Sequence, residues 1–501
     1  MRNPAISILF FITWICIVPA EGQEMLGTTL GNYAGINSVQ LNPSAMHNSK
    51  QYLDIQITGL DVFLQNNYLY QDKKDYSFWH FFQLDYEYPT HAEKYGTEER
   101  YFYAITDGRN KNVYLNLRVN GPGAMLIWDR HAFGLTTALR ASVSATQVPQ
   151  NIANFMYLGL NYLPQHNINY IINQKFGAAG VAWGEIGLSY AYMLYQQRYD
   201  RISIGASVKR LLGLAGGYMS VHKMDYVVPD DSTMIVNNME ANYGFSLPLN
   251  YDNNEFIKGD WVKGGGFGFD VGVTYTHTLQ GAYKQYIRRP CELRYEDYLY
   301  RIGVALVDIG RIRFKTNAVD YAIDNRSSYW WDVDQLDFES ISRFMDTISY
   351  RFYGNNTATY RDNKVDIWLP SAFSMQCDLH YLGPWYLNAS LIYGFRLSET
   401  GIRRPAQISV TPRYETDWFE ASLPLSLYDW SLPRIGLAVR FYGLTIGTEK
   451  LGQFFHFQDF TGMDLYFTLK IPIEKGSCGP RGPRGCPGMD KAPSVKKKKK
   501  S

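Results

Sequence analysis

Apolar and polar residues alternate along many short runs of this chain. The run from Asp464 to Ile473 places five apolar side chains at its odd positions, and Asp464 and Lys470 stand at even ones. The runs Arg201–Lys209, Phe267–Thr276 and Arg434–Phe441 repeat this pattern. Because side chains alternate across a strand, each run has one apolar and one polar face. This is the pattern expected of a barrel wall with lipid outside and a polar lumen inside.

We therefore predict an all-β fold, a transmembrane antiparallel β-barrel of about 14 strands, an even number as bacterial barrels require. Two interrupted runs, at Gly121-Pro122-Gly123 and Asp308-Ile309-Gly310, are each counted as one kinked strand. Long connections (65–111, 146–184, 214–264 and 317–370) then fall at one end and tight turns at the other, with 279–297 as a long exception. The predicted strands are 51–64, 112–128, 132–145, 185–196, 201–213, 265–278, 298–316, 371–382, 385–396, 406–414, 417–427, 434–442, 443–448 and 462–473.

Composition agrees with a membrane barrel without requiring one. Aromatic residues make up 16% of the chain, with 40 Tyr, and charged residues make up 19%. Tyr and Trp supply the interfacial girdles of such barrels. A secreted, Tyr-rich carbohydrate-binding or sandwich protein is the alternative on composition alone.

The N-terminus has the features of a secretory signal peptide. Arg2 precedes an apolar run from Ile6 to Val18, and Ala20 and Gly22 predict cleavage before Gln23. Nothing later supplies about 18 consecutive apolar residues, so a membrane-spanning mature chain requires a closed barrel. Residues 23–50 do not alternate, and the stretch Gly31–Met46 is uncharged, which suits a plug in the lumen. The expected division is 1–22 signal peptide, 23–50 plug or hatch, 51–473 barrel and 474–501 periplasmic tail.

The predicted tail differs in character from the rest of the chain. From Lys475 onward it holds nine Lys or Arg and one acidic residue, so the basicity of a chain with net charge +2 is local. Its Gly/Pro-rich sequence cannot build a core, and its cations suit lipid head groups, cell-wall carboxylates or an acidic partner as well as plain solvation. Cys478 and Cys486 could close a small disulfide in an oxidising periplasm, and free thiols are an equal alternative.

Several motifs resemble those of FadL-like (long-chain fatty-acid transporter type) outer-membrane barrels. Asn32-Tyr33-Ala34-Gly35 and Asn42-Pro43-Ser44-Ala45-Met46 resemble the start of the family, whose N-terminal hatch carries Asn-Pro-Ala; Ser44 stands where that motif has Ala. The chain is most similar to an uncharacterised family of Bacteroidota outer-membrane proteins. That resemblance covers nearly the whole mature chain and rests on Gly121–Gly123 with His131–Thr137, Trp183–Leu188, Asp308–Ile312, Pro412–Tyr414 and Trp418–Glu420.

The resemblance implies a fourteen-stranded barrel in which a hatch gates a path for hydrophobic ligands. Asn42 and Pro43 are the hatch candidates. In the family a strand kink opens a lateral exit, for which Gly121, Pro122 and Gly123 are the candidates here. Proline removes a ladder donor and glycine weakens a strand, so a local gap is physically reasonable. A plain β-bulge that bends the wall is the more common outcome.

The charges on the polar faces are the remaining candidate residues. Lys209, Asp270, Arg301 and Arg440 would be costly against lipid, so we expect them in the lumen. Paired networks that fill the barrel or hold the hatch are the main interpretation, and ligand selection is the alternative. Gly264-Gly265-Gly266-Phe267-Gly268 leads into a strand, so it fails the context of a dinucleotide loop. No nucleophile elbow or metal spacing occurs in the sequence, and we expect no enzyme activity, cofactor or metal, and no nucleic-acid partner.

The sequence thus predicts a protein of the cell outer membrane, exported by a cleaved signal peptide, that acts as a FadL-like channel or transporter for hydrophobic small molecules. Its expected partners are outer-membrane lipid and a hydrophobic ligand. The alternative is a non-transporting structural or accessory subunit of an outer-membrane secretion or assembly complex, with periplasmic or outer-membrane protein partners.

Overall fold

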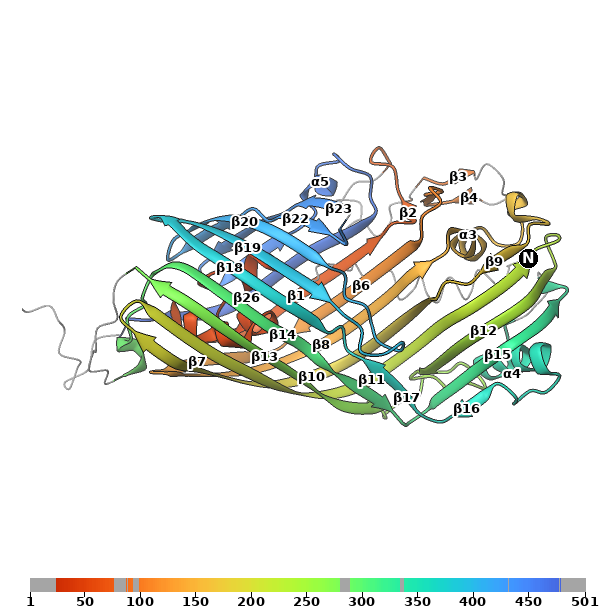
Figure 1. The fold of residues 1–501 in the computed structure, drawn as a ribbon, viewed down its shortest axis with the longest axis horizontal. Helices are drawn as coiled ribbons and strands as arrows, with labels where there is room; N and C mark the ends of the chain where they lie inside the picture. The colour runs from red at the N-terminus through yellow and green to blue at the C-terminus, as the bar shows by residue number, and fades with distance from the viewer. Residues whose placement is uncertain are drawn as a thin grey trace, which may run out of the picture.

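The chain forms a closed antiparallel β-barrel of 14 strands (Figure 1). The computed structural model describes residues 24–75, 87, 89–92, 99–279, 289–333, 338–430, 432–476 and 478. The predicted signal peptide and nearly all of the basic tail lie outside these residues. The last strand pairs with the first, from Gln51↔Glu474 to Thr58↔Leu469. The barrel therefore leaves no unpaired edge strand in its wall, which is the condition for spanning lipid.

Each predicted strand corresponds to a wall strand or to a pair of short strands in line. They are, in order, β1 (Gln51–Asn66), β6 (Lys111–Asn120) with β7 (Gly123–Trp128), β8 (His131–Val148), β10 (Phe176–Gln197), β11 (Asp200–Val227), β13 (Gly264–Thr278), β14 (Tyr298–Phe314), β17 (Val365–Trp368) with β18 (Ala372–Leu382), β19 (Trp385–Gly394), β20 (Gln407–Glu415), β21 (Phe419–Ser422) with β22 (Leu425–Tyr428), β23 (Leu432–Ile435) with β24 (Leu437–Phe441), β25 (Leu444–Thr448) and β26 (Gly462–Glu474).

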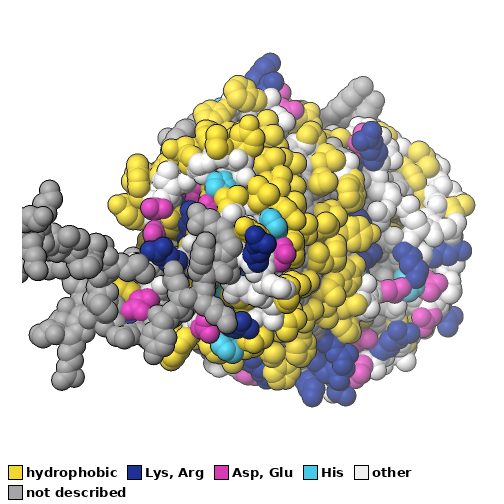
Figure 2. Space-filling view, turned by 60° about the vertical axis from the view of Figure 1, so that its left-hand side comes forward, with side chains coloured by type: hydrophobic (Ala, Val, Ile, Leu, Met, Phe, Trp, Pro, Cys, Tyr) yellow, Lys and Arg dark blue, Asp and Glu magenta, His cyan; other side chains and the backbone are white. Residues whose placement is uncertain are grey.

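The alternation predicted from sequence determines which side chains face outward. On β13, Phe267, Phe269, Val271 and Val273 are 42–53% exposed, whereas Asp270 and Thr274 between them are at most 2% exposed. Figure 2 shows the result on one face of the molecule as a broad hydrophobic band across the wall, with charged side chains on either side of it. The period of two thus separates an apolar exterior from a polar interior.

The two ends of the barrel differ. At the short-turn end, tight connections join β7 to β8, β10 to β11, β18 to β19 and β24 to β25. At the opposite end, the long-loop end, β11 continues past the wall to pair with β12 (Met234–Ser246), and β12 pairs with β15 (Ala318–Trp330). The prediction of loops over 214–264 and 317–370 was therefore wrong in part. Stacked Tyr243 and Tyr321 from β12 and β15, with ring centroids 5.2 Å apart, stabilise this extension.

Short strands, helices and turns lie outside the barrel wall. The remaining strands are β2 (Leu69–Tyr70), β3 (His91–Ala92), β4 (Glu99–Arg100), β5 (Tyr103–Ala104), β9 (Tyr170–Ile172) and β16 (Tyr360–Asp362). The helices outside the lumen are α3 (Gln150–Leu158), α4 (Ile341–Tyr353) and α5 (Leu451–Phe454), with 3₁₀ turns η4 (Leu163–Gln165) and η5 (Pro290–Glu292). Among the described residues, no helix has the length and apolar character needed to cross a membrane.

Both predicted kinks are bulges in an otherwise paired wall. β1 pairs with β6 through Gly59↔Asn120 and with β7 through Gln56↔Gly123. On the other side, β8 pairs with both β6 and β7, so an unbroken strand runs along each side of the Gly-Pro-Gly break. In β14, the register against β13 shifts around Asp308, whose φ is +56°. A bulge bends a strand and re-aims a side chain. Here it turns the Asp308 carboxylate into the lumen.

The cysteine pairing differs from the alternative considered from sequence. Cys478 forms a disulfide with Cys291, not with Cys486. Cys291 lies in the long connection between β13 and β14 at the short-turn end, and its carbonyl accepts a hydrogen bond of 2.6 Å from the Gly476 N–H. This contact brings the start of the tail to Cys291, which sequence spacing could not reveal. Cys486 lies outside the described residues, and Cys377 is a free thiol.

Candidate functional site

Residues 24–50 lie inside the barrel, and nearly all of them are buried. They form α2 (Leu26–Thr29), η1 (Gly35–Gln40) and η2 (Pro43–Asn48), drawn in red within the short-turn half of the barrel (Figure 1). We call them the N-terminal segment. Its apolar side chains join two clusters with inward-facing wall residues: Leu26, Leu30 and Leu41 with Ala305, Val307, Ala372 and Ile392, and Ile36, Val39 and Met46 with Met125, Ile127, Ala132 and Ala191.

Three wall glycines make room for the turn at Asn42-Pro43-Ser44. A Cβ on Gly205 would lie 2.5 Å from the Ser44 nitrogen, and one on Gly303 would lie 2.7 Å from Asn42 Nδ2. A Cβ on Gly272 would collide with Asn42 Oδ1. Gly205 and Gly272 are direct partners on β11 and β13, and glycine in a strand interior often marks such a close approach. We call these three residues the glycine cradle.

Asn42 and Pro43 start a 3₁₀ turn of the N-terminal segment. The Asn42 side chain accepts hydrogen bonds from the Ser44 N–H at 3.0 Å and the Ser44 hydroxyl at 2.6 Å. Its Nδ2 donates to Thr274 Oγ1 on β13 at 3.2 Å. Pro43 occupies the first turn of η2, where a missing N–H costs nothing. The motif thus fixes the segment to the wall.

Two of the predicted lumen charges contact the N-terminal segment. Arg301 donates to Asn32 Oδ1 at 3.3 Å and to the Asn48 carbonyl at 3.4 Å. Arg440 pairs with Glu420 at 3.1 Å, and its guanidinium lies 3.8 Å from the centroid of the Tyr33 ring. Such contacts between buried cations and backbone or aromatic groups stabilise one position of the segment.

The other two predicted charges belong to a network in the middle of the lumen. Lys209 Nζ lies 2.8 Å from Asp270 and 2.7 Å from Asp308. Asp308 also accepts two 3.0 Å hydrogen bonds from Arg140, which in turn pairs with Glu185 at 3.2 Å. All five side chains are less than 10% exposed. Opposite charges at these distances compensate the desolvation of each group.

Further contacts came from residues that the sequence did not single out. Lys470 on β26 donates to the carbonyls of Tyr33 and Ala34 at 2.8 and 2.9 Å and pairs with Asp54 at 3.1 Å. Glu415 pairs with Lys50 at 2.8 Å and accepts from Asn32 Nδ2 at 3.0 Å. Their inward phase on alternating strands was the available signal, but the phase alone names no partner.

The connection between β19 and β20, residues 395–406, folds into the lumen from the long-loop end. We call it the inner loop. Its Ile402 packs into an apolar cluster of the wall together with Trp183, Ile312 and Phe314. Its Arg404 makes a bidentate pair with Glu24 of the N-terminal segment at 2.8 and 2.5 Å, and it approaches Asp308 at 3.6 Å. The two segments that enter the barrel therefore meet at one buried ion pair. No alternating run or motif marks this connection in the sequence.

The lumen is filled where these segments meet. A cavity of about 10 Å³ lies among Glu24, Arg140, Asp308 and Arg404, and one of about 30 Å³ borders the N-terminal segment beside Thr274 and Arg301. These volumes admit one or two waters. Larger pockets of about 290 and 370 Å³ open at the long-loop end, lined in part by Arg403 and by residues 396–399 of the inner loop.

The Gly121-Pro122-Gly123 break is closed by hydrogen bonds. The Gly121 N–H donates to the Thr137 carbonyl at 2.8 Å, and the Thr137 hydroxyl donates to the Pro122 carbonyl at 2.8 Å. The proline is thus bridged on the β8 side despite its missing donor. A lateral exit at this point stays a prediction.

Comparison with known proteins finds one family model and several solved structures of low sequence identity. The model of a family described as "Family of unknown function (DUF5723)" matches residues 43–449. No curated protein is significantly similar. Three similar solved structures are a TodX deltaS2S3 mutant monoaromatic hydrocarbon channel (9% identity, TM-score 0.41, 90% of this chain and 99% of that one), the Pseudomonas putida toluene transporter TodX (9%, 0.39, 91% and 98%) and a Pseudomonas aeruginosa FadL homologue (10%, 0.28, 90% and 97%). These TM-scores are too low to support a shared activity, so the barrel rests on this chain's own strand pairing.

Proposed function

The chain belongs to the family of unknown function DUF5723, and we propose that it is an outer-membrane β-barrel that passes small hydrophobic molecules through a gated lumen. The closed wall and its hydrophobic band support residence in a bilayer. In a bacterial cell, barrels of this kind belong in the outer membrane, in agreement with the predicted signal peptide.

The observation that carries the proposal is an apolar cluster packed in the long-loop half of the lumen. It is formed by inward-facing side chains of β10, β11, β14 and β17 with neighbouring residues, namely Ala179, Val181, Trp183, Leu211, Ile312, Phe314, Ala318, Val365, Ile367 and Leu369. The interior of a water-filled pore is polar. A lumen lined in this way suits an apolar ligand, since its burial there removes apolar surface from water.

Ile402 of the inner loop packs within this apolar cluster. A hydrophobic molecule entering from the long-loop end would replace Ile402 against the same side chains. We infer that the inner loop is the outer gate and that residues 23–50 act as the plug below it. The ion pair between Arg404 and Glu24 couples the two. Asn42 and Pro43, seated on the glycine cradle, would hold the plug in the closed state.

A second function is supported by the ion pairs and hydrogen bonds that fill the lumen. A non-transporting subunit of an outer-membrane complex would need a rigid, sealed barrel with docking elements at its ends. The disulfide that ties the start of the basic tail to the short-turn end supports this alternative. Periplasmic or outer-membrane protein partners would then bind the tail or the loops.

Two measurements on the full-length protein separate these functions. The first is uptake of the hydrophobic fluorophore N-phenyl-1-naphthylamine by cells that express the wild type or the Asn42→Ala or Pro43→Ala variant. The second is mass spectrometry of lipid or detergent retained in the purified barrel. Transport predicts retained apolar molecules and wild-type uptake above that of cells without the protein. It also predicts higher uptake by the two variants, because they loosen the closed plug. Stoichiometric co-purification of partner proteins with an empty barrel, and uptake no different from cells without the protein, would refute it.

A further inference from the structure

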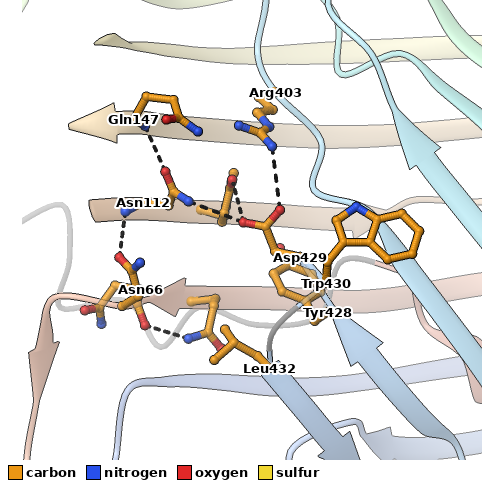
Figure 3. A pocket seen from close by; sticks show the side chains of 11 residues that line it. Asn66, Asn112, Gln147, Arg403, Tyr428, Asp429, Trp430 and Leu432 are labelled. Carbon is orange, nitrogen blue, oxygen red and sulfur yellow. Dashed lines mark hydrogen bonds and ion pairs between the residues drawn. The ribbon is translucent and has the colours of Figure 1, made fainter. Parts of the chain in front are cut away.

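A pocket with a mostly polar lining lies at the long-loop end of the barrel. The pocket of about 290 Å³ lies between the outer ends of β1, β6 and β8 and the turn that joins β22 to β23 (Figure 3). Its volume is at the small end of the range for ligand sites. The lining is mainly carboxamide, phenol, carboxylate and guanidinium groups with one indole, contributed by Gln65, Asn66, Asn67, Asn112, Tyr114, Gln147, Arg403, Tyr428, Asp429, Trp430 and Leu432.

The polar groups around Asp429 are held in place before any ligand arrives. Asp429 Oδ2 accepts hydrogen bonds from Asn112 Nδ2 at 3.3 Å and from the Tyr114 hydroxyl at 3.2 Å. Asp429 Oδ1 faces Arg403 Nη2 at 3.7 Å. Asn112 Oδ1 accepts from the Gln147 N–H at 2.8 Å. A carboxylate fixed on one oxygen, with a guanidinium near the other, is a preorganised partner for a hydroxyl group that both donates and accepts.

Trp430 stands on this turn in a conformation that a bulky residue rarely adopts. Asp429 and Trp430 have φ of +45° and +59°. A large side chain in the left-handed region is strained, and such strain persists only where the surroundings impose it. The indole is 55% exposed, so burial of the side chain does little to offset the strain. The turn instead presents a flat apolar face beside the fixed polar groups of Asp429 and Arg403, as Figure 3 shows.

We propose that this pocket binds a saccharide ring. A pyranose has an apolar face of C–H groups, which packs on an indole, and an equatorial rim of hydroxyls, which carboxylates, guanidinium groups and carboxamides bind. An aromatic hydrocarbon would fill the same volume, but it would remove water from the Asp429 and Arg403 charges without adding a hydrogen bond to either group. This ligand therefore differs in chemistry from the apolar cargo of the lumen, and the site stands whether or not the barrel transports.

The turn itself supplies a variant that separates binding from folding. Trp430→Gly removes the indole and places the residue best suited to φ +59° at that position, so the barrel should retain or raise its Tm. Asp429→Asn keeps the shape and removes the charge. Trp261→Ala is the matched control, because Trp261 is 61% exposed at the same end and does not line the pocket.

The test is isothermal titration calorimetry of the full-length purified barrel with glucose, galactose, mannose, N-acetylglucosamine and their disaccharides. We expect binding of at least one probe by the wild type and by Trp261→Ala, and about tenfold or greater weakening in Trp430→Gly and Asp429→Asn. No heat from any of these probes at millimolar concentration, or undiminished affinity in Trp430→Gly, would overturn the proposal. If toluene binds the wild type and only Trp430→Gly loses that binding, the result would also overturn the proposal, in favour of an apolar ligand. Uptake of the hydrophobic fluorophore is measured separately, so failure of one proposal leaves the other testable.

Discussion

The ion pair between Glu24 and Arg404 joins the N-terminal segment to the inner loop, and its loss should lower the free energy of unfolding substantially. The two side chains are 4% and 6% exposed and share two hydrogen bonds. Glu24→Met leaves the Arg404 guanidinium buried with Asp308 as its remaining carboxylate, at 3.6 Å. Removing one partner of a buried pair costs about 3–5 kcal/mol, because the other charge stays desolvated. We expect a cost in that range for Glu24→Met and for Arg404→Met.

Removing both charges should cost less than removing one. In the Glu24→Met, Arg404→Met double variant no uncompensated charge remains, and apolar replacements of buried pairs cost about 1 kcal/mol or less in favourable cases. The matched control is Glu399→Gln on the same loop. Glu399 pairs with Lys175 at 2.8 Å, but the side chains are 51% and 65% exposed, and exposed pairs contribute about 0–1 kcal/mol.

Thermal denaturation of the purified barrel, followed by the shift in gel mobility on unfolding, measures all four variants. The reasoning requires the double variant to be more stable than either single variant. Two single effects that simply add in the double variant would show that the two groups do not interact. Single effects no larger than that of Glu399→Gln would show that the pair is solvated, and with it that the lumen is open where we place the gate.

Three other outcomes follow from contacts of the described residues. Gly272→Ala should destabilise the barrel by about 1–3 kcal/mol through overpacking against the N-terminal segment and so lower its Tm, whereas Gly268→Ala on the same strand, whose Cβ meets nothing closer than 3.4 Å, should not. Cys478→Ser should make the Cys291 thiol reactive to maleimide, and labelling of Cys291 in the unreduced wild type would contradict the pairing. The pKa of Glu399 is lowered below 4.5 chiefly by a lysine hydrogen bond, so its small stabilisation is present above pH 4.5 and is lost as pH falls through the folded value. The difference in Tm between wild type and Glu399→Gln should vanish under acid conditions.

The wall could be predicted from the sequence because one face of each strand meets a single environment. Phe267 to Val273 alternate with Asp270 and Thr274, and a period of two fixes both the strand and its inward face. The kinks were also predictable, because Gly-Pro-Gly and Asp-Ile-Gly interrupt the alternation without ending it. The extension of β11 with β12 and β15 was missed, since strands that leave the bilayer need not alternate.

The interior could not be predicted to the same degree. The alternation placed Lys209 and Asp270 inward, yet their meeting with Asp308 depends on a bulge that turns that carboxylate into the lumen. The Glu24 and Arg404 pair joins residues 380 positions apart, and neither belongs to a periodic run. The pairing of Cys291 with Cys478 likewise depends on which connection lies beside the tail. Such contacts follow from the three-dimensional course of loops, which local pattern does not determine.

The glycine cradle has a consequence for the order in which this protein assembles. Gly205, Gly272 and Gly303 weaken three adjacent strands unless the turn at Asn42-Pro43-Ser44 covers them. Lys470, which donates hydrogen bonds to the same segment, lies on the strand that completes the ring. A ring completed over an empty interior would leave that ammonium with Asp54 but without the Tyr33 and Ala34 carbonyls, and it would leave the three glycines uncovered. The first residues of the folded chain should therefore be in place when the last strand docks, and the segment acts as a template for closure as well as an obstacle to passage.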